Sequence, residues 1–246
     1  MFEYIQCRKC KPKQSKTSPA GYYKDIEIKN GIEYSVVKEC SCHVEWRIKE
    51  ERFKKFIKNG FNKDFFNINM NKSYIGTKSI GNISRLNNYI EKFNNNIKVK
   101  SSILYFYGQP DTQKEETFNW IASNLIEPNN IKYVTFISFF DDTQKAAFMS
   151  AEYPESQERV IIYENCDLLI IDEVDDRDIS ENQFQYLEKI FHRRMSNNLG
   201  IIFVSELPIE KLKNKIFIKF LEKECKKNNF EFLFNDIKND IPEVLF

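Results

Sequence analysis

Short apolar runs alternate with amphipathic segments in the C-terminal part of the chain, and this alternation constrains the fold more than any other feature. The runs are continuously apolar, which is typical of strands buried on both faces, while the segments between them carry apolar residues at helical spacing. Strands separated by helices predict a parallel sheet covered on both sides, and therefore an α/β fold. The expected strands are 103–107, 133–138, 167–172 and 200–205, and the expected helices are 83–93, 115–125 and 181–195.

A degenerate phosphate-binding loop follows the first of these strands. Gly108 and Lys114 stand at the spacing of the first glycine and the lysine in G-x-x-x-x-G-K-[ST], whose backbone N–H groups cradle phosphates. Gln113 stands where the second glycine belongs, and Glu115 stands where a serine or threonine would hold Mg²⁺. A lone lysine between a strand and a helix is usually structural, so this loop alone is a weak indication of nucleotide binding.

Two adjacent carboxylates, Asp172 and Glu173, end the expected strand that contains LLII and strengthen the nucleotide interpretation. In ATPases with this pattern, the first carboxylate orients Mg²⁺ and the second polarises the attacking water. We therefore take Asp172 and Glu173 as candidate catalytic residues, and Gly108, Lys114 and Asp172 as candidate ligands of ATP and Mg²⁺. The alternative is an acidic loop that caps the next helix.

Four of the six cysteines lie near the N-terminus at metal-ligand spacing: Cys7, Cys10, Cys40 and Cys42. Between the two pairs, Asn30-Gly31 separates two runs rich in aromatic and β-branched residues, which is a strong hairpin signal. Such a hairpin would bring the pairs together, and four thiolates suit a structural Zn²⁺ with no open position. Four unlinked buried thiols are the alternative, and His43 is a substitute ligand. We expect Cys166 at a strand end and Cys225 in a helix, both away from this site.

A basic segment follows the cysteines and has the spacing of a helix that ends near Gly60. Its Lys and Arg residues either contact a DNA backbone or are simply solvated. Its aromatic residues, such as Phe53 and Phe56, either dock a partner or pack in the core.

The amino-acid composition excludes several classes of protein. The 246 residues hold 37 Lys and Arg against 36 Asp and Glu, so the chain is not a uniformly basic nucleic-acid coat protein. No apolar run approaches the roughly 20 residues of a membrane span, and no secretory signal is recognisable, so we expect a cytoplasmic chain with reduced cysteines. Through Lys63 there are 15 basic and 8 acidic residues, against 22 and 28 in the remainder. We expect domains at 1–62 and 101–246, with a connector and helix at 63–100.

The order of these motifs resembles the bacterial and phage replicative helicase loaders of the DnaC/DnaI type, AAA+ proteins related to IstB transposition helpers. The resemblance covers nearly the whole chain and is strongest in the cysteine pattern, in LLIIDE at 168–173 and in IIFVSELP at 201–208. It implies an AAA+ parallel-sheet, P-loop-type core with a small N-terminal zinc-binding α+β domain that grips the hexameric helicase. It also implies binding of ATP and single-stranded DNA. Arg193 and Arg194, which follow an amphipathic helix, are candidate contacts to the DNA backbone, and a solvated helix end is the alternative. Homo-oligomerisation on the helicase is a further expectation.

Three departures from that family concern the catalytic apparatus. Gln113 and Glu115 alter the loop, and Glu206 replaces the sensor amide. After Pro208 the chain has lysines but no arginine, and lysine lacks the bidentate fork that arginine offers a phosphoryl group. We therefore expect a replication protein that binds a DnaB-type helicase and helps load it on single-stranded DNA, with weak or no ATP hydrolysis. The alternatives are an active DNA-dependent ATPase, an inhibitor of helicase loading and a transposition helper.

Overall fold

The computed structural model describes residues 21–66, 79–95, 103–109, 114–125, 130–148, 152–175, 179–225 and 231–234. The chain forms two compact units, residues 1–55 and residues 56–246, which divide within helix α1 (Ser41–Lys58). Cys7, Cys10 and the loop residues 110–113 lie outside the described residues. The predicted domain boundaries stay predictions.

The N-terminal unit contains the predicted hairpin. Strands β1 (Tyr22–Lys29) and β2 (Ile32–Glu39) pair antiparallel, with Lys29 opposite Ile32 beside the turn. Asn30 and Gly31 have φ values of 53° and 79°, as a two-residue turn with two left-handed residues requires. Helix α1 follows directly, so the helix expected after the cysteines is also confirmed.

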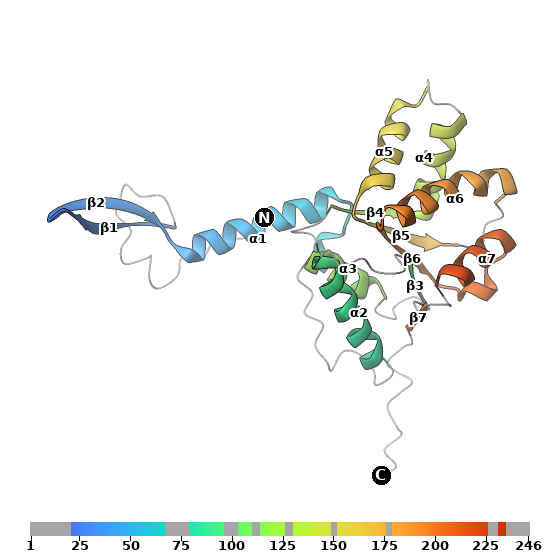
Figure 1. Ribbon diagram of the computed structural model, residues 1–246, viewed down its shortest axis with the longest axis horizontal. Coiled ribbons are helices and arrows are strands. Elements are labelled where there is room, and N and C mark those ends of the chain that lie inside the picture. Colours follow the sequence, from blue (N-terminus) through green and yellow to red (C-terminus); the bar gives the residue numbers. More distant parts are fainter. Residues whose placement is uncertain are drawn as a thin grey trace, which may run out of the picture. The chain divides into compact units, whose positions relative to one another are not determined.

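The second unit is built on a parallel sheet (Figure 1). Within the described residues, its five strands run in the order β4-β5-β6-β3-β7, and every neighbouring pair is parallel. The predicted α/β class is therefore confirmed. The strands are β3 (Ile103–Gly108), β4 (Ile131–Thr135), β5 (Leu168–Val174), β6 (Gly200–Ser205) and β7 (Glu231–Phe234).

Helices cover both faces of this sheet. Helices α4, α5, α6 and α7 contribute buried residues to one face, and α2, α3 and the end of α1 contribute to the other. Their bounds are α2 (Ser79–Asn94), α3 (Lys114–Leu125), α4 (Phe136–Phe148), α5 (Pro154–Asn165), α6 (Glu181–Ser196) and α7 (Lys215–Glu224). Two short 3-10 helices span Lys63–Phe65 and Ile209–Lys211.

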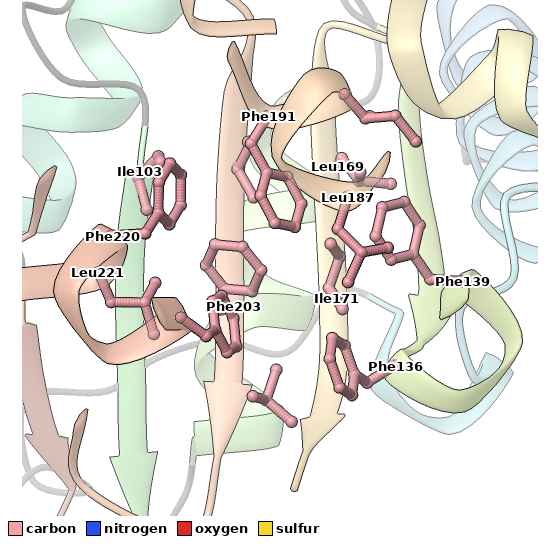
Figure 2. Packing of buried hydrophobic residues seen from close by; sticks show 14 of the residues in the cluster. Ile103, Phe136, Phe139, Leu169, Ile171, Leu187, Phe191, Phe203, Phe220 and Leu221 are labelled. Atoms are coloured by element: carbon pink, nitrogen blue, oxygen red, sulfur yellow. The ribbon is translucent and has the colours of Figure 1, made fainter. Parts of the chain in front are cut away.

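Successive strand residues alternate between the two cores. Ile103 and Tyr105 of β3 belong to the α4–α7 core, whereas Leu104 and Phe106 belong to the core under α2 and α3. Figure 2 shows the first core, where aromatic side chains from helices and strands meet. In it, the Phe191 ring lies edge-on to the Phe203 ring at 5.3 Å. The continuous apolar runs in the sequence are thus explained by burial on both faces.

Strand β4 corrects one prediction. The strand expected at 133–138 ends at Thr135, and Phe136 begins helix α4. The Thr135 hydroxyl oxygen accepts a hydrogen bond from the Ser138 backbone N–H at 3.4 Å, which is the bond of a helix N-cap. The apolar residues after Thr135 thus start a helix.

Other packing predictions can be compared directly with the structure. Cys166, just before β5, and Cys225, at the end of α7, are buried in the α4–α7 core. Phe56 is fully buried in the opposite core, so docking of a partner by its side chain is excluded in this conformation. Among the residues described, none of the helices combines the length and apolar character that a bilayer span requires.

Candidate functional site at the carboxyl edge of the sheet

The carboxyl edge of the sheet gathers several of the residues predicted for nucleotide binding. Gly108 ends β3, Asp172 lies near the end of β5, and Lys114 begins helix α3. Because the strands are parallel, their carboxyl ends share one edge, which is where open α/β sheets bind ligands. The structure therefore brings Gly108, Lys114 and Asp172 together.

Lys114 is held by backbone carbonyls. Its Nζ donates to the Gly108 oxygen at 2.6 Å and to the Ser205 oxygen at 3.0 Å. Burial lowers the pKa of Lys114, and the charges of Glu206 and Asp172 oppose that shift. The ammonium group thus ties the end of β3 to the end of β6.

Asp172 accepts a hydrogen bond on each carboxylate oxygen. The Tyr133 hydroxyl donates to Oδ2 at 2.9 Å, and the Glu173 backbone N–H donates to Oδ1 at 2.7 Å. Burial raises the pKa of Asp172 above its ordinary value, and these two donors together with the Lys114 charge offset only part of that rise. Protein groups therefore fix this carboxylate in one orientation.

Glu173 interrupts the strand. The backbone of Glu173 is left-handed, with a φ of 56°, and its side chain is exposed. The pairing of β5 with β6 shifts register between Ile171 and Val174, on either side of this irregularity. A non-glycine residue in this region costs about 1 kcal/mol or more, and such strain is concentrated at functional sites. Beyond the irregularity, the Ser205 hydroxyl donates to the Val174 oxygen at 2.6 Å and restores the connection between the strands.

The charges at this edge are mostly negative. Glu115 stands in the first turn of α3, where burial raises its pKa and the nearby Asp172 charge raises it further. Glu173 lies in β5 one residue before its end, and Glu206 follows the end of β6. The charges of Glu206 and Asp172 act on Lys114. Carboxylate oxygens are the ligands that Mg²⁺ prefers, whereas a free triphosphate would be repelled. These acids therefore disfavour ATP at this edge unless a metal ion offsets their charge.

Arg194 corrects a site prediction. Its side chain is fully buried, and its guanidinium donates to the Tyr163 oxygen and, at 2.6 Å, to the Gly200 oxygen. The proposed DNA contact of Arg194 is therefore wrong, because the group ties the end of α5 to the start of β6. Arg193 is exposed and pairs with Glu164, and its role in DNA binding stays a prediction.

The zinc site also stays a prediction. Cys40 is buried and Cys42 is half-buried, while their predicted co-ligands lie outside the described residues. The described residues contain no group of three or more His, Cys, Asp or Glu side chains arranged to hold a metal ion. His43 lies beside these cysteines, and its Nδ1 is 2.7 Å from Glu39 Oε1, an interaction that lowers the pKa of Glu39.

Sequence reasoning missed two residues of the carboxyl edge. Tyr133 and Ser205 were expected only as residues of the strands at 133–138 and 200–205. The available signal was positional: β4 and β5 pair so that Thr135 lies opposite Asp172, and residues near the ends of neighbouring parallel strands meet. That register cannot be read from either strand alone.

Comparisons with known proteins agree with this architecture. The sequence matches no protein-family model and no curated protein. Similar solved structures include a DNA replication initiation factor (TM-score 0.54, 16% identity, 71% of this chain and 50% of that chain). They also include domain III of the Thermotoga maritima replication initiation protein DnaA (0.52, 15%, 68% and 69%) and DnaI (0.51, 14%, 72% and 94%). The chain spans about half the length of the first of these. At such identities the likeness shows the fold alone: this chain shares the parallel-sheet α/β fold of these structures.

Proposed function

We propose that this chain is a DNA replication protein that binds a hexameric DnaB-type helicase and helps place it on single-stranded DNA, with weak or no ATP hydrolysis. The observation that carries the proposal is the carboxyl edge of an AAA+-like sheet. Lys114 and Asp172 are retained there, but backbone carbonyls hold the lysine and Tyr133 holds the aspartate. Glu115 adds a negative charge where Mg²⁺ would be bound in an intact loop.

The N-terminal hairpin supports the helicase-binding part of the proposal. Ile26, Ile28 and Val37 lie on one face of this two-stranded sheet and are 64%, 68% and 59% exposed. A two-stranded sheet is marginally stable by itself, and clustered exposed apolar side chains are typical of interaction surfaces. We propose that this face contacts the helicase and that Zn²⁺ bound by Cys7, Cys10, Cys40 and Cys42 stabilises the unit.

Co-elution with the cognate hexameric helicase tests the proposal. The double variant Ile26→Ser/Ile28→Ser should lose co-elution while its thermal unfolding matches the parent. The matched control is Ile32→Ser/Tyr34→Ser, which removes two exposed apolar residues from the opposite face and should still co-elute. Failure of the parent protein to bind any replicative helicase of its host would refute the proposal. Loss of co-elution in the control variant alone would show that the helicase contacts the opposite face of the hairpin.

A DNA-dependent ATPase is the second candidate function, favoured by the presence of Lys114 and Asp172 at one edge of the sheet. Calorimetry with ATP, with and without Mg²⁺, distinguishes the candidates: the leading proposal expects weak binding that requires Mg²⁺. Hydrolysis that DNA or helicase stimulates, and that Lys114→Ala abolishes, would establish the ATPase instead. A helicase-unwinding assay on protein-coated single strands separates a loader from an inhibitor.

A further inference from the structure

Contacts within the second unit join Asp172 to the last turn of helix α1 through a single residue, Tyr133. The Tyr133 hydroxyl donates to Asp172 at 2.9 Å. The backbone N–H of the same residue donates to the Asn59 oxygen at 3.0 Å. Its ring lies 5.6 Å from the ring of Phe61. Tyr133 thus touches the acidic edge with its side-chain tip and the end of α1 with its backbone and ring.

The end of α1 has a closely defined geometry. Gly60 has a φ of 97°, its N–H donates to the Ile57 oxygen at 3.0 Å, and the Phe61 N–H donates to the Phe56 oxygen at 3.3 Å. These two bonds form a Schellman motif, and the stacked Phe56 and Phe61 rings, 4.6 Å apart, supply its apolar contact. A β-carbon on Gly60 would lie 3.0 Å from the Tyr133 carbonyl oxygen. The turn is therefore packed directly against β4.

Strand β4 explains why this turn is held there. Among the described strands β4 lies at one edge of the sheet, so part of its backbone has no neighbour among them. The Asn59 carbonyl satisfies the Tyr133 N–H, which a buried edge would otherwise leave unpaired. Because the α1 turn replaces a strand neighbour at this position, movement of β4 near Tyr133 must move the turn.

The phenol is also fixed on its other side. The ring of Phe118, from the helix that Lys114 begins, stacks on Tyr133 at 5.6 Å and 20°. The expected hydroxyl next to the lysine is missing, because position 115 is Glu. A hydroxyl from β4 reaches Asp172 in its place.

We propose that Tyr133 is a positioning residue that couples the state of Asp172 to the last turn of α1. Loss of the bond between the Tyr133 hydroxyl and Asp172 should therefore loosen the α1 turn. The coupling rests only on the contacts of Tyr133.

A double-mutant cycle read by amide hydrogen exchange tests the coupling. Tyr133→Phe keeps the ring that packs on Phe61 and Phe118 but removes the donor, and Asp172→Ala removes the acceptor. Each should speed exchange of the segment 57–61 by about tenfold, as expected for loss of a hydrogen bond to a charged group. The double variant should exchange no faster than the single ones, because both remove the same bond.

Tyr105→Phe is the matched control. Tyr105 lies on β3, and its hydroxyl donates to the Leu207 oxygen at 2.7 Å in the other core. This variant should leave exchange of the segment 57–61 within about twofold of the parent. Equal exchange in Tyr133→Phe and the parent would overturn the inference, as would fully additive effects in the cycle. No nucleotide, metal or helicase is added, so the result holds whether or not the proposed function does, and the two phenylalanine variants decide the question even if Asp172→Ala unfolds.

Discussion

Substitution of Gly60 by alanine should destabilise the second unit by about 1–2 kcal/mol, because it places a β-carbon in a left-handed turn. The φ of 97° at Gly60 is unfavourable for any residue with a β-carbon. Reduced freedom of the unfolded chain returns about 0.4–1 kcal/mol. The new carbon would also lie 3.0 Å from the Tyr133 carbonyl oxygen, closer than an ordinary contact. Backbone oxygen cannot rotate away as a flexible side chain can, so we expect this contact to cancel the entropic gain.

Urea denaturation followed by far-ultraviolet circular dichroism measures this loss, with thermal unfolding as a second assay. A loss of 1–2 kcal/mol corresponds to a drop of about 2–8 °C in the unfolding temperature of a domain of this size. Gly60→Asn is the matched control, since asparagine tolerates the left-handed region but adds the same β-carbon. It should be less destabilised than the alanine variant. An alanine variant within about 0.5 kcal/mol of the parent would refute both the turn geometry and the close contact with β4.

Three further substitutions test the structural roles assigned above. Lys114→Met keeps the aliphatic stem and loses two hydrogen bonds to carbonyls, so urea denaturation should show a loss of about 1–3 kcal/mol, whereas a lysine kept only for nucleotide would show none. Arg194→Met leaves buried carbonyls unpaired and should cost about 3 kcal/mol or more by the same assay, while DNA affinity measured by fluorescence anisotropy should not change. Cys40→Ser should lower the zinc content found by elemental analysis and expose the hairpin to proteolysis; unchanged zinc would contradict the predicted ligand set.

The parallel sheet was predictable because its central strands are buried on both faces. The strands expected at 103–107 and 200–205 agree with β3 and β6 to within one residue, since a fully buried strand leaves an unbroken apolar run. The end of β4 was not predictable in this way. Phe136 and Ile137 continue its apolar pattern, and the switch to helix depends on the cap formed by Thr135.

Some residues of the candidate site were likewise predictable from the sequence, and others were not. Gly108, Lys114 and Asp172 could be assigned to one edge because parallel strands end together. The roles of Tyr133 and Arg194 could not be assigned, because each depends on contacts between residues far apart in the sequence. The Tyr133 hydroxyl meets a carboxylate 39 positions away, and the Arg194 guanidinium meets a carbonyl 31 positions away. An arginine next to an exposed arginine gives no local sign that it is buried.

The cost of burying a charge gives Lys114 and Asp172 structural roles that do not require a nucleotide. An ammonium or carboxylate group enclosed at the sheet edge without partners would destabilise the fold by several kcal/mol. In a working site, phosphate and Mg²⁺ act as the partners. In this structure the Gly108 and Ser205 carbonyls accept hydrogen bonds from the lysine, and the Tyr133 hydroxyl donates one to the aspartate. Each residue therefore contributes to folding without a nucleotide, and its loss would destabilise the protein. Both residues are therefore compatible with a chain that we propose hydrolyses ATP weakly or not at all.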